Sequence, residues 1–229
     1  SLLAQQPAAP AAPAAPETCL QTGIIQGPAN FKSVDVLPDH RVTFNVCAPG
    51  ATEVRVTSND IADVIPMGRA ASGLAMTRDA KGLWSVTTDK PVAPDNYRFN
   101  FSVNGVKVPD PQSTTFTTDR IGVNSTFEAP GDAGKFQTWN KDVPHGTVSV
   151  VEYWSNSLGA KRRAHVYTPP GYFTSSKRYP VLYLLHGGGD LDPGWSMTGR
   201  AHIIMDNLLA EGKAKPFIIV MENGGGSAA

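Results

Sequence analysis

The sequence predicts an all-β immunoglobulin-like sandwich followed by the start of a parallel α/β sheet with flanking helices. Three observations lead there. The 229 residues include 22 Gly and 19 Pro, which is typical of short elements joined by turns. Segments of alternating polarity occur between about 41 and 127, and unbroken apolar segments with a helical pattern between them follow 147.

Composition excludes several functional classes. The chain has 20 basic and 20 acidic residues and no net charge, so it lacks the basic excess of an electrostatic nucleic-acid binder. A hydrophobic fraction of 41% excludes wholesale disorder. The longest apolar runs, 181–185 and 217–221, are far shorter than the roughly 20 residues that span a bilayer. We therefore expect neither a nucleic-acid nor a membrane partner.

The N-terminal segment 1–18 is predicted to be an extended tether. Its prolines recur at every third position from Pro7 to Pro16, which favours a solvated polyproline conformation. The first five residues resemble the end of a secretory signal around its cleavage site, although an arbitrary boundary is an equal alternative. If the chain is exported, Cys19 and Cys47 are candidates for a disulfide; otherwise they are two free thiols.

Residues 19–130 are predicted to form the sandwich. Alternation over 41–46, 53–57, 82–87 and 97–103 predicts strands, and Asn104-Gly105 predicts a tight hairpin turn. Tyr97, Phe99 and Phe101 share one face, which favours a core position over a sugar-stacking platform. For Trp84 both positions remain open.

Residues 131–146 are predicted to be a linker, and 147–229 the α/β portion. Strands are expected at 147–153, 164–167, 179–185 and 217–221, the last two buried. Apolar residues recur at helical spacing from Ala201 to Leu209, and Gly212 is a good helix stop.

The main chemical signal is His186-Gly187-Gly188-Gly189, directly after an apolar strand. Ligands in open α/β sheets bind beyond the carboxyl ends of the strands, and glycines there leave backbone N–H groups accessible. An oxyanion hole is one interpretation of this loop, and a plain glycine turn is the other.

These motifs and their surroundings give the chain a resemblance to two known families. The segments Val166–Tyr172 and Tyr179–Gly187, together with Gly199–Ala201 and Asp206–Lys213, resemble carbohydrate esterase family 1, which includes feruloyl and acetyl xylan esterases. Phe44–Pro49, Gly82–Trp84, Tyr97–Gly105 and Asp110-Pro111 resemble carbohydrate-binding module family 48. Whether such a module binds glycan here or only supports the esterase region is open.

The esterase resemblance implies that residues 147–229 are the N-terminal part of an α/β-hydrolase, with a Ser-His-Asp/Glu triad and with neither cofactor nor metal. Gly188 matches the position whose N–H serves the oxyanion hole, and Gly187, Gly189 and Trp195 would line the substrate site. For Trp195, simple packing within its loop is an equal alternative. The Gly-x-Ser-x-Gly motif that carries the nucleophile in this family does not occur in the 229 residues; the most similar segment, around Ser227, lacks the final Gly. We therefore expect the nucleophile, acid and base beyond Ala229, and no catalysis by the 229 residues alone.

The resemblance implies a secreted or periplasmic serine esterase that releases acyl groups from plant cell-wall polysaccharide. Its partner would be a polysaccharide or a small ester substrate. Two alternatives remain: a non-catalytic carbohydrate-binding or scaffold fragment, and an esterase for siderophores or other small acyl esters.

Overall fold

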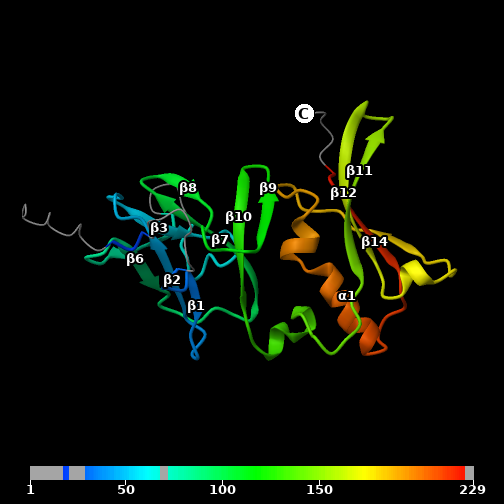
Figure 1. Ribbon diagram of the computed structural model, residues 1–229, viewed down its shortest axis with the longest axis horizontal. Helices are drawn as coiled ribbons and strands as arrows, with labels where there is room; N and C mark the ends of the chain where they lie inside the picture. The colour runs from blue at the N-terminus through cyan, green and yellow to red at the C-terminus, as the bar shows by residue number, and fades with distance from the viewer. Residues whose placement is uncertain (1–17, 21–28, 68–71, 225–229) are drawn as a thin grey trace, which may run out of the picture.

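A computed structural model describes residues 18–20, 29–67 and 72–224 of the chain (Figure 1). The described part is mostly β, with two antiparallel sheets, one mixed sheet and few helices. The two antiparallel sheets lie at the N-terminal side, and the mixed sheet lies beside the single α-helix at the C-terminal side. No helix among the described residues is long and apolar enough to cross a membrane.

The N-terminal region consists of two sheets packed face to face. The first has the order β1 (Val34–Val36), β2 (Val42–Cys47), β6 (Leu83–Thr87) and β5 (Thr77–Arg78). The second has the order β4 (Leu74–Ala75), β3 (Val54–Thr57), β7 (Asp95–Val103), β10 (Gly122–Ala129) and β9 (Phe116–Asp119), with β8 (Val106–Val108) also on β7. The four strands predicted from alternation are present. We name residues 34–129 the N-terminal sandwich.

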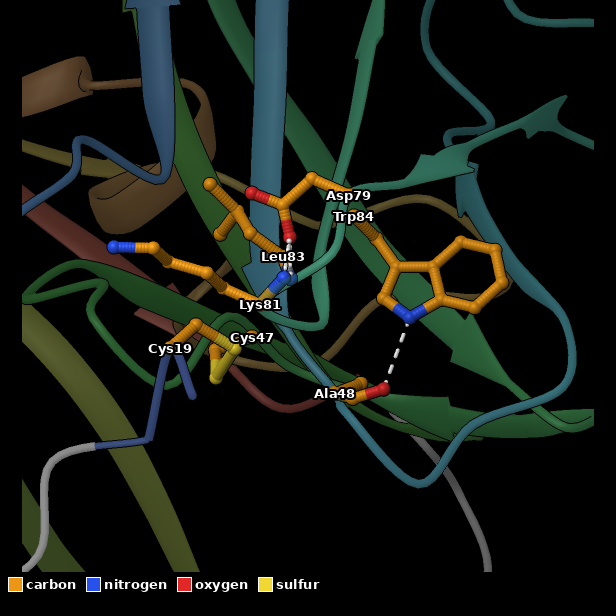
Figure 2. The surroundings of a disulfide bond; sticks show 7 residues. All are labelled: Cys19, Cys47, Ala48, Asp79, Lys81, Leu83 and Trp84. Atoms are coloured by element: carbon orange, nitrogen blue, oxygen red, sulfur yellow. Dashed lines mark hydrogen bonds between the residues drawn. A yellow bond between two sulfur atoms is a disulfide. The ribbon is translucent and has the colours of Figure 1, made fainter. Parts of the chain in front are cut away.

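Aromatic rings from both sheets fill the space between them. The Phe44 ring of the first sheet lies 5.3 Å from Phe99 and 5.5 Å from Phe127 of the second, between ring centroids. Tyr97, Phe99 and Phe101 are all at most 8% exposed, so the prediction that they are core residues is confirmed. Trp84 is also buried, and its Nε1 donates to the carbonyl of Ala48 at 2.9 Å (Figure 2). None of these four rings is available as a stacking platform.

The turn between β7 and β8 has the predicted chemistry. Asn104 and Gly105 have φ of 49° and 82°, the positive values that a type I′ hairpin requires. The Asn104 side chain also accepts the backbone N–H groups of Thr52 and Glu53, at 2.9 and 3.1 Å.

Cys19 and Cys47 form a disulfide, with their Cα atoms 5.6 Å apart (Figure 2). Cys47 is the last residue of β2, and the Cys19 N–H donates to the carbonyl of Lys81 at 2.8 Å. The disulfide therefore attaches the segment before the sandwich to the end of β2, and the hydrogen bond attaches it to the turn that precedes β6. The predicted tether lies almost wholly in residues 1–17, outside the described residues.

The mixed sheet has the order β11 (Thr147–Ser155), β12 (Ala160–Thr168), β14 (Ile218–Glu222) and β13 (Val181–Tyr183). Helix α1 (Ala201–Ala210) packs Ala201 and Met205 on Tyr167, Ile219 and Met221 of β12 and β14. The helix is followed by Gly212 with φ of 68°, which confirms the predicted stop. Shorter helical segments are η1 (Asp132–Gln137), η2 (Tyr172–Thr174) and η3 (Gly194–Thr198).

Two expectations for this sheet need correction. A parallel sheet was predicted, but within the described strands only β13 and β14 pair in parallel. The turn at 156–159 is too short for a crossover, so β11 and β12 must form an antiparallel hairpin.

The predicted burial of 179–185 is also wrong in the described chain. Val181, Leu182 and Tyr183 are 45%, 41% and 68% exposed. The physical reason is that β13 is the edge of the sheet and pairs with β14 alone among the described strands. An apolar run predicts burial, but it cannot tell which strand of a sheet forms the edge.

Candidate functional site

The candidate site is the loop that follows β13, which we name the glycine loop (residues 186–190). Leu184 continues the pairing of β13 by donating its N–H to the carbonyl of Val220 at 2.9 Å. The loop therefore begins at the carboxyl end of the parallel pair β13–β14, where ligands bind in open α/β sheets.

His186 joins the ends of two strands. Its Nε2 accepts the N–H of Gly224, which follows β14, at 3.0 Å. Its Nδ1 lies 2.8 Å from the carbonyl of Gly187, so this nitrogen carries the proton and donates. With one nitrogen donating and the other accepting, the ring fixes the loop and is not placed as a general base.

Gly188 and Gly189 are open to their surroundings. Apart from the adjacent residues in the chain, no described atom lies within 4 Å of a Cβ built on either residue, and a Cβ at Gly187 would meet only Asp190 Oδ2 at 3.5 Å. None of the three has a positive φ. Among the described residues neither backbone strain nor crowding requires glycine here. The remaining physical reason is access, because a missing side chain lets another molecule approach the backbone closely.

A shallow cavity of about 180 Å³ lies beside the glycine loop. Its lining includes His186, Gly187, Asp190, Trp195 and, from the N-terminal sandwich, Arg98. Trp195 Nε1 donates to the carbonyl of Leu185 at 2.8 Å, and 37% of the residue remains exposed. The structure thus brings the sequence-predicted Gly187 and Trp195 together around one cavity, with Gly188 and Gly189 in the adjoining loop.

A Ser, a His and an Asp also meet outside this cavity. His165 Nδ1 lies 2.5 Å from Ser196 Oγ, and its Nε2 lies 3.5 Å from Asp192 Oδ2. Ser196 is only 2% exposed and also donates to the carbonyl of Pro193. Because this hydroxyl is buried and is hydrogen-bonded to both His165 and Pro193, the structure does not present it to an ester carbonyl.

The acid of this group is also engaged elsewhere. The Asp192 carboxylate is paired by Arg163 through Nε and Nη2, at 2.7 and 2.9 Å. Burial lowers the pKa of His165, with Arg163 acting in the same direction and Asp192 against it. We therefore interpret this group as a structural link between β12 and η3.

The other histidines and the loop after β14 have no place in the cavity lining. His145 contacts Asp206 of α1 through Nδ1 at 3.0 Å. His202 is at the start of α1, where burial lowers its pKa. Of the segment 222–227, Glu222 is the last residue of β14, residues 223–224 follow the strand, and Ser227 lies outside the described residues. His40 lies in the turn between β1 and β2.

Sequence reasoning missed the part of the site that comes from the N-terminal sandwich. Arg98 of β7 and Asp190 form an ion pair at 2.6 Å although 92 residues separate them. Arg120, in the turn between β9 and β10, donates its N–H to the carbonyl of Gly189 at 3.1 Å. No sequence pattern near Arg98 or Arg120 predicts either contact. The one available signal was Asp190, the acidic residue directly after the glycines.

Comparison with protein families connects the C-terminal third of the chain with esterases. Residues 155–229 match the family model described as "Putative esterase". A curated relative, the endo-1,4-beta-xylanase/feruloyl esterase of Xylanibacter ruminicola, is 36% identical over 185 residues, which is 78% of this chain. The chain spans only 25% of that relative's length.

Comparison with solved structures supports the fold. The enterobactin esterase FES of Shigella flexneri matches 84% of this chain and 54% of its own, with a TM-score of 0.52 and 16% identity. A ferulic acid esterase of the anaerobic fungus Anaeromyces mucronatus is 33% identical over 40% of this chain and 34% of its own, with a TM-score of 0.38. Residues 155–229, which match the esterase family, include the glycine loop and the whole cavity lining except Arg98.

Proposed function

We propose that this chain is the N-terminal part of a serine carboxylic ester hydrolase of the α/β-hydrolase fold. The observation that supports the proposal most directly is the open glycine loop at the carboxyl end of β13, within the residues that match the esterase family. In the proposed mechanism a Ser gives its proton to a His and attacks the ester carbonyl, and the Gly188 N–H donates to the tetrahedral oxyanion. The alcohol leaves with that proton, and water then hydrolyses the acyl-enzyme.

The proposal places the nucleophile, its base and its acid in sequence beyond residue 229. Among the described strands β13 pairs with β14 alone, and its other edge, with the exposed Leu182 and Tyr183, is where we expect the next strand of the sheet to pair. The nucleophile would follow that strand, close to the glycine loop, because the carboxyl ends of parallel strands meet at one edge of a sheet. The 229 residues alone would then be inactive.

We propose feruloyl or acetyl esters of plant cell-wall polysaccharide as substrates. The support is the 36% identity to the xylanase/feruloyl esterase, which extends over both regions of the chain. Immediately beside the glycine loop, Trp195 would offer an aromatic surface to the acyl or leaving group. We further propose export to an oxidising compartment, where the Cys19–Cys47 disulfide would persist.

The test uses the full-length protein that contains this chain. Methyl ferulate, p-nitrophenyl acetate, acetylated xylan and a catecholate siderophore ester are offered to it, and to a 229-residue fragment. We expect hydrolysis of a feruloyl or acetyl ester by the full-length protein alone. Hydrolysis of only the siderophore ester would overturn the substrate, and no hydrolysis together with retardation on xylan gels would favour a binding module.

A matched pair of variants tests the role of Gly188. Gly188→Pro removes the N–H, whereas Gly188→Ala keeps it and has space for its methyl group. Losing one oxyanion donor lowers kcat by about 100- to 1,000-fold. We expect that loss for the Pro variant and activity within a few-fold of wild type for the Ala variant. Equal kcat in both would show that this N–H does not contact the oxyanion.

A further inference from the structure

Arg98 is held within the N-terminal sandwich and reaches out of it. Its Nη2 and Nε donate to the Asp60 carboxylate at 2.7 and 3.0 Å, and Asp60 also accepts the Arg98 backbone N–H at 2.8 Å. This leaves Nη1, which donates to Asp190 Oδ1 at 2.6 Å. Only 25% of the Arg98 side chain is exposed, so the pair is partly shielded from water.

A second contact comes from a different element of the sandwich. Arg120 donates its backbone N–H to the carbonyl of Gly189 at 3.1 Å. Asp119, the last residue of β9, forms an antiparallel bridge with Asp190. The sandwich therefore contacts both the backbone and the side chain at the end of the glycine loop.

The contacts with the sandwich lie on the C-terminal side of Gly188, the residue to which the proposed function assigns the oxyanion donor. The Asp190 N–H donates to the carbonyl of Gly187 at 3.1 Å, which closes a turn around Gly188. His186 fixes the beginning of the loop through Gly224. Three consecutive glycines have much conformational freedom, so a fixed direction of the Gly188 N–H requires restraints at both ends.

We propose that the N-terminal sandwich positions the glycine loop, with Arg98 as the main positioning residue. The inference rests on the proposed esterase function and answers the question of what the sandwich contributes to it. Catalysis by an oxyanion hole depends on donors that are already in place before the charge develops. Without Arg98, Asp190 loses its partner and the loop populates conformations in which the Gly188 N–H points elsewhere.

The interface also offers a control that does not contact the loop. Arg200, directly before α1, donates to Glu128 of β10 at 2.5 Å and to Asn96 of β7 at 3.1 Å. This ion pair joins the same two regions and is buried to a similar extent, with 16% and 30% of the side chains exposed. Glu128→Gln therefore weakens docking in general but leaves the contacts of the glycine loop intact.

The experiment compares Arg98→Gln, Arg98→Lys and Glu128→Gln in the full-length protein. For methyl ferulate we expect Arg98→Gln to lower kcat by about 10- to 100-fold, because a displacement near 1 Å of a catalytic group has an effect of that size. KM should stay within about two-fold of the wild-type value, because the Gly188 N–H donates to an oxyanion that exists only after the ester has been attacked. Arg98→Lys should restore part of kcat, because a lysine keeps the charge but cannot pair both Asp60 and Asp190.

Two results would overturn the proposal. One is a kcat of Arg98→Gln equal to that of wild type; the other is an equal loss of kcat in Glu128→Gln, which would indicate general docking. If Arg98→Gln does not fold, Asp190→Asn replaces it, with the same expectation for kcat and KM.

A readout independent of activity separates this inference from the proposed function. Hydrogen–deuterium exchange of the peptide 184–191 should be faster in Arg98→Gln than in wild type and unchanged in Glu128→Gln. If wild type hydrolyses none of the esters, the proposed function fails, while this exchange pattern still supports positioning. Equal exchange in all three proteins overturns positioning, whatever the activity.

Discussion

Asp206 of α1 is a carboxylate that is only 2% exposed and is satisfied by three donors. Tyr167 of β12 donates its hydroxyl to Oδ1 at 2.6 Å, Gly146 donates its N–H to Oδ1 at 3.0 Å, and His145 Nδ1 lies 3.0 Å from Oδ2. Tyr167 itself is fully buried. Replacing Tyr167 with Phe removes one donor and leaves the ring in place.

The expected effect follows from the charge of the acceptor. A hydrogen bond to a charged group contributes about 1.5–3 kcal/mol, so Tyr167→Phe should lower the free energy of unfolding by that amount. With a typical urea dependence of about 2 kcal/mol per molar, the unfolding midpoint should fall by about 1 M. Tyr153→Phe is the matched control, because its hydroxyl reaches Glu222 at 3.5 Å and the residue is 38% exposed. We expect it to change stability by less than about 0.5 kcal/mol.

The pH dependence provides a second test of the same bond. Burial raises the pKa of Tyr167, and Asp206 raises it further. A phenol whose pKa is higher in the folded than in the unfolded state stabilises the fold below pH 10, and this contribution decreases as the pH rises above 10. The difference between wild type and Tyr167→Phe should therefore shrink above pH 10. A Tyr167→Phe variant that unfolds at the same urea concentration as Tyr153→Phe would refute the reasoning.

Three further predictions concern other parts of the chain. Reducing the Cys19–Cys47 disulfide, which closes a separation of 28 residues, should destabilise the N-terminal sandwich by about 3–4 kcal/mol, measured by thermal unfolding with and without reductant; an unchanged midpoint would contradict it. Burial lowers the pKa of His165 and His202, so the free energy of unfolding should fall as the pH decreases below about 6.5, by up to about 1.4 kcal/mol per pH unit for each histidine. Replacing either histidine with Gln should make stability less dependent on pH, measured by urea titrations from pH 7.5 to 5. Ser196→Ala should keep ester hydrolysis within a few-fold of wild type, since this hydroxyl is buried; an inactive, folded variant would reassign the nucleophile.

Local pattern predicted the parts of the fold whose cause is local. Val42, Phe44 and Val46 alternate, and each is at most 5% exposed, because one face of β2 packs on the core. Asn104-Gly105 predicted the hairpin turn, because both residues readily adopt the positive φ that the turn has. The exposure of β13 was not predictable in this way. The run from Val181 to Leu185 has the composition of a central strand, but its position at the edge of the sheet depends on which strands pair with it.

The glycine loop shows the same division within the candidate site. The motif from His186 to Gly189 can be recognised in the sequence because adjacent residues form it. The contact that restrains the loop comes from Arg98, which is distant in sequence and half-buried in another sheet. In the sequence alone, Arg98 is an ordinary polar residue on the outer face of a strand, because its two neighbours in the chain, Tyr97 and Phe99, are core residues. Only the pairing of Asp60 and Asp190 with the two sides of one guanidinium gives it a role. If that role is correct, the sandwich cannot be exchanged for an unrelated domain without loss of kcat, even where folding and ester binding survive.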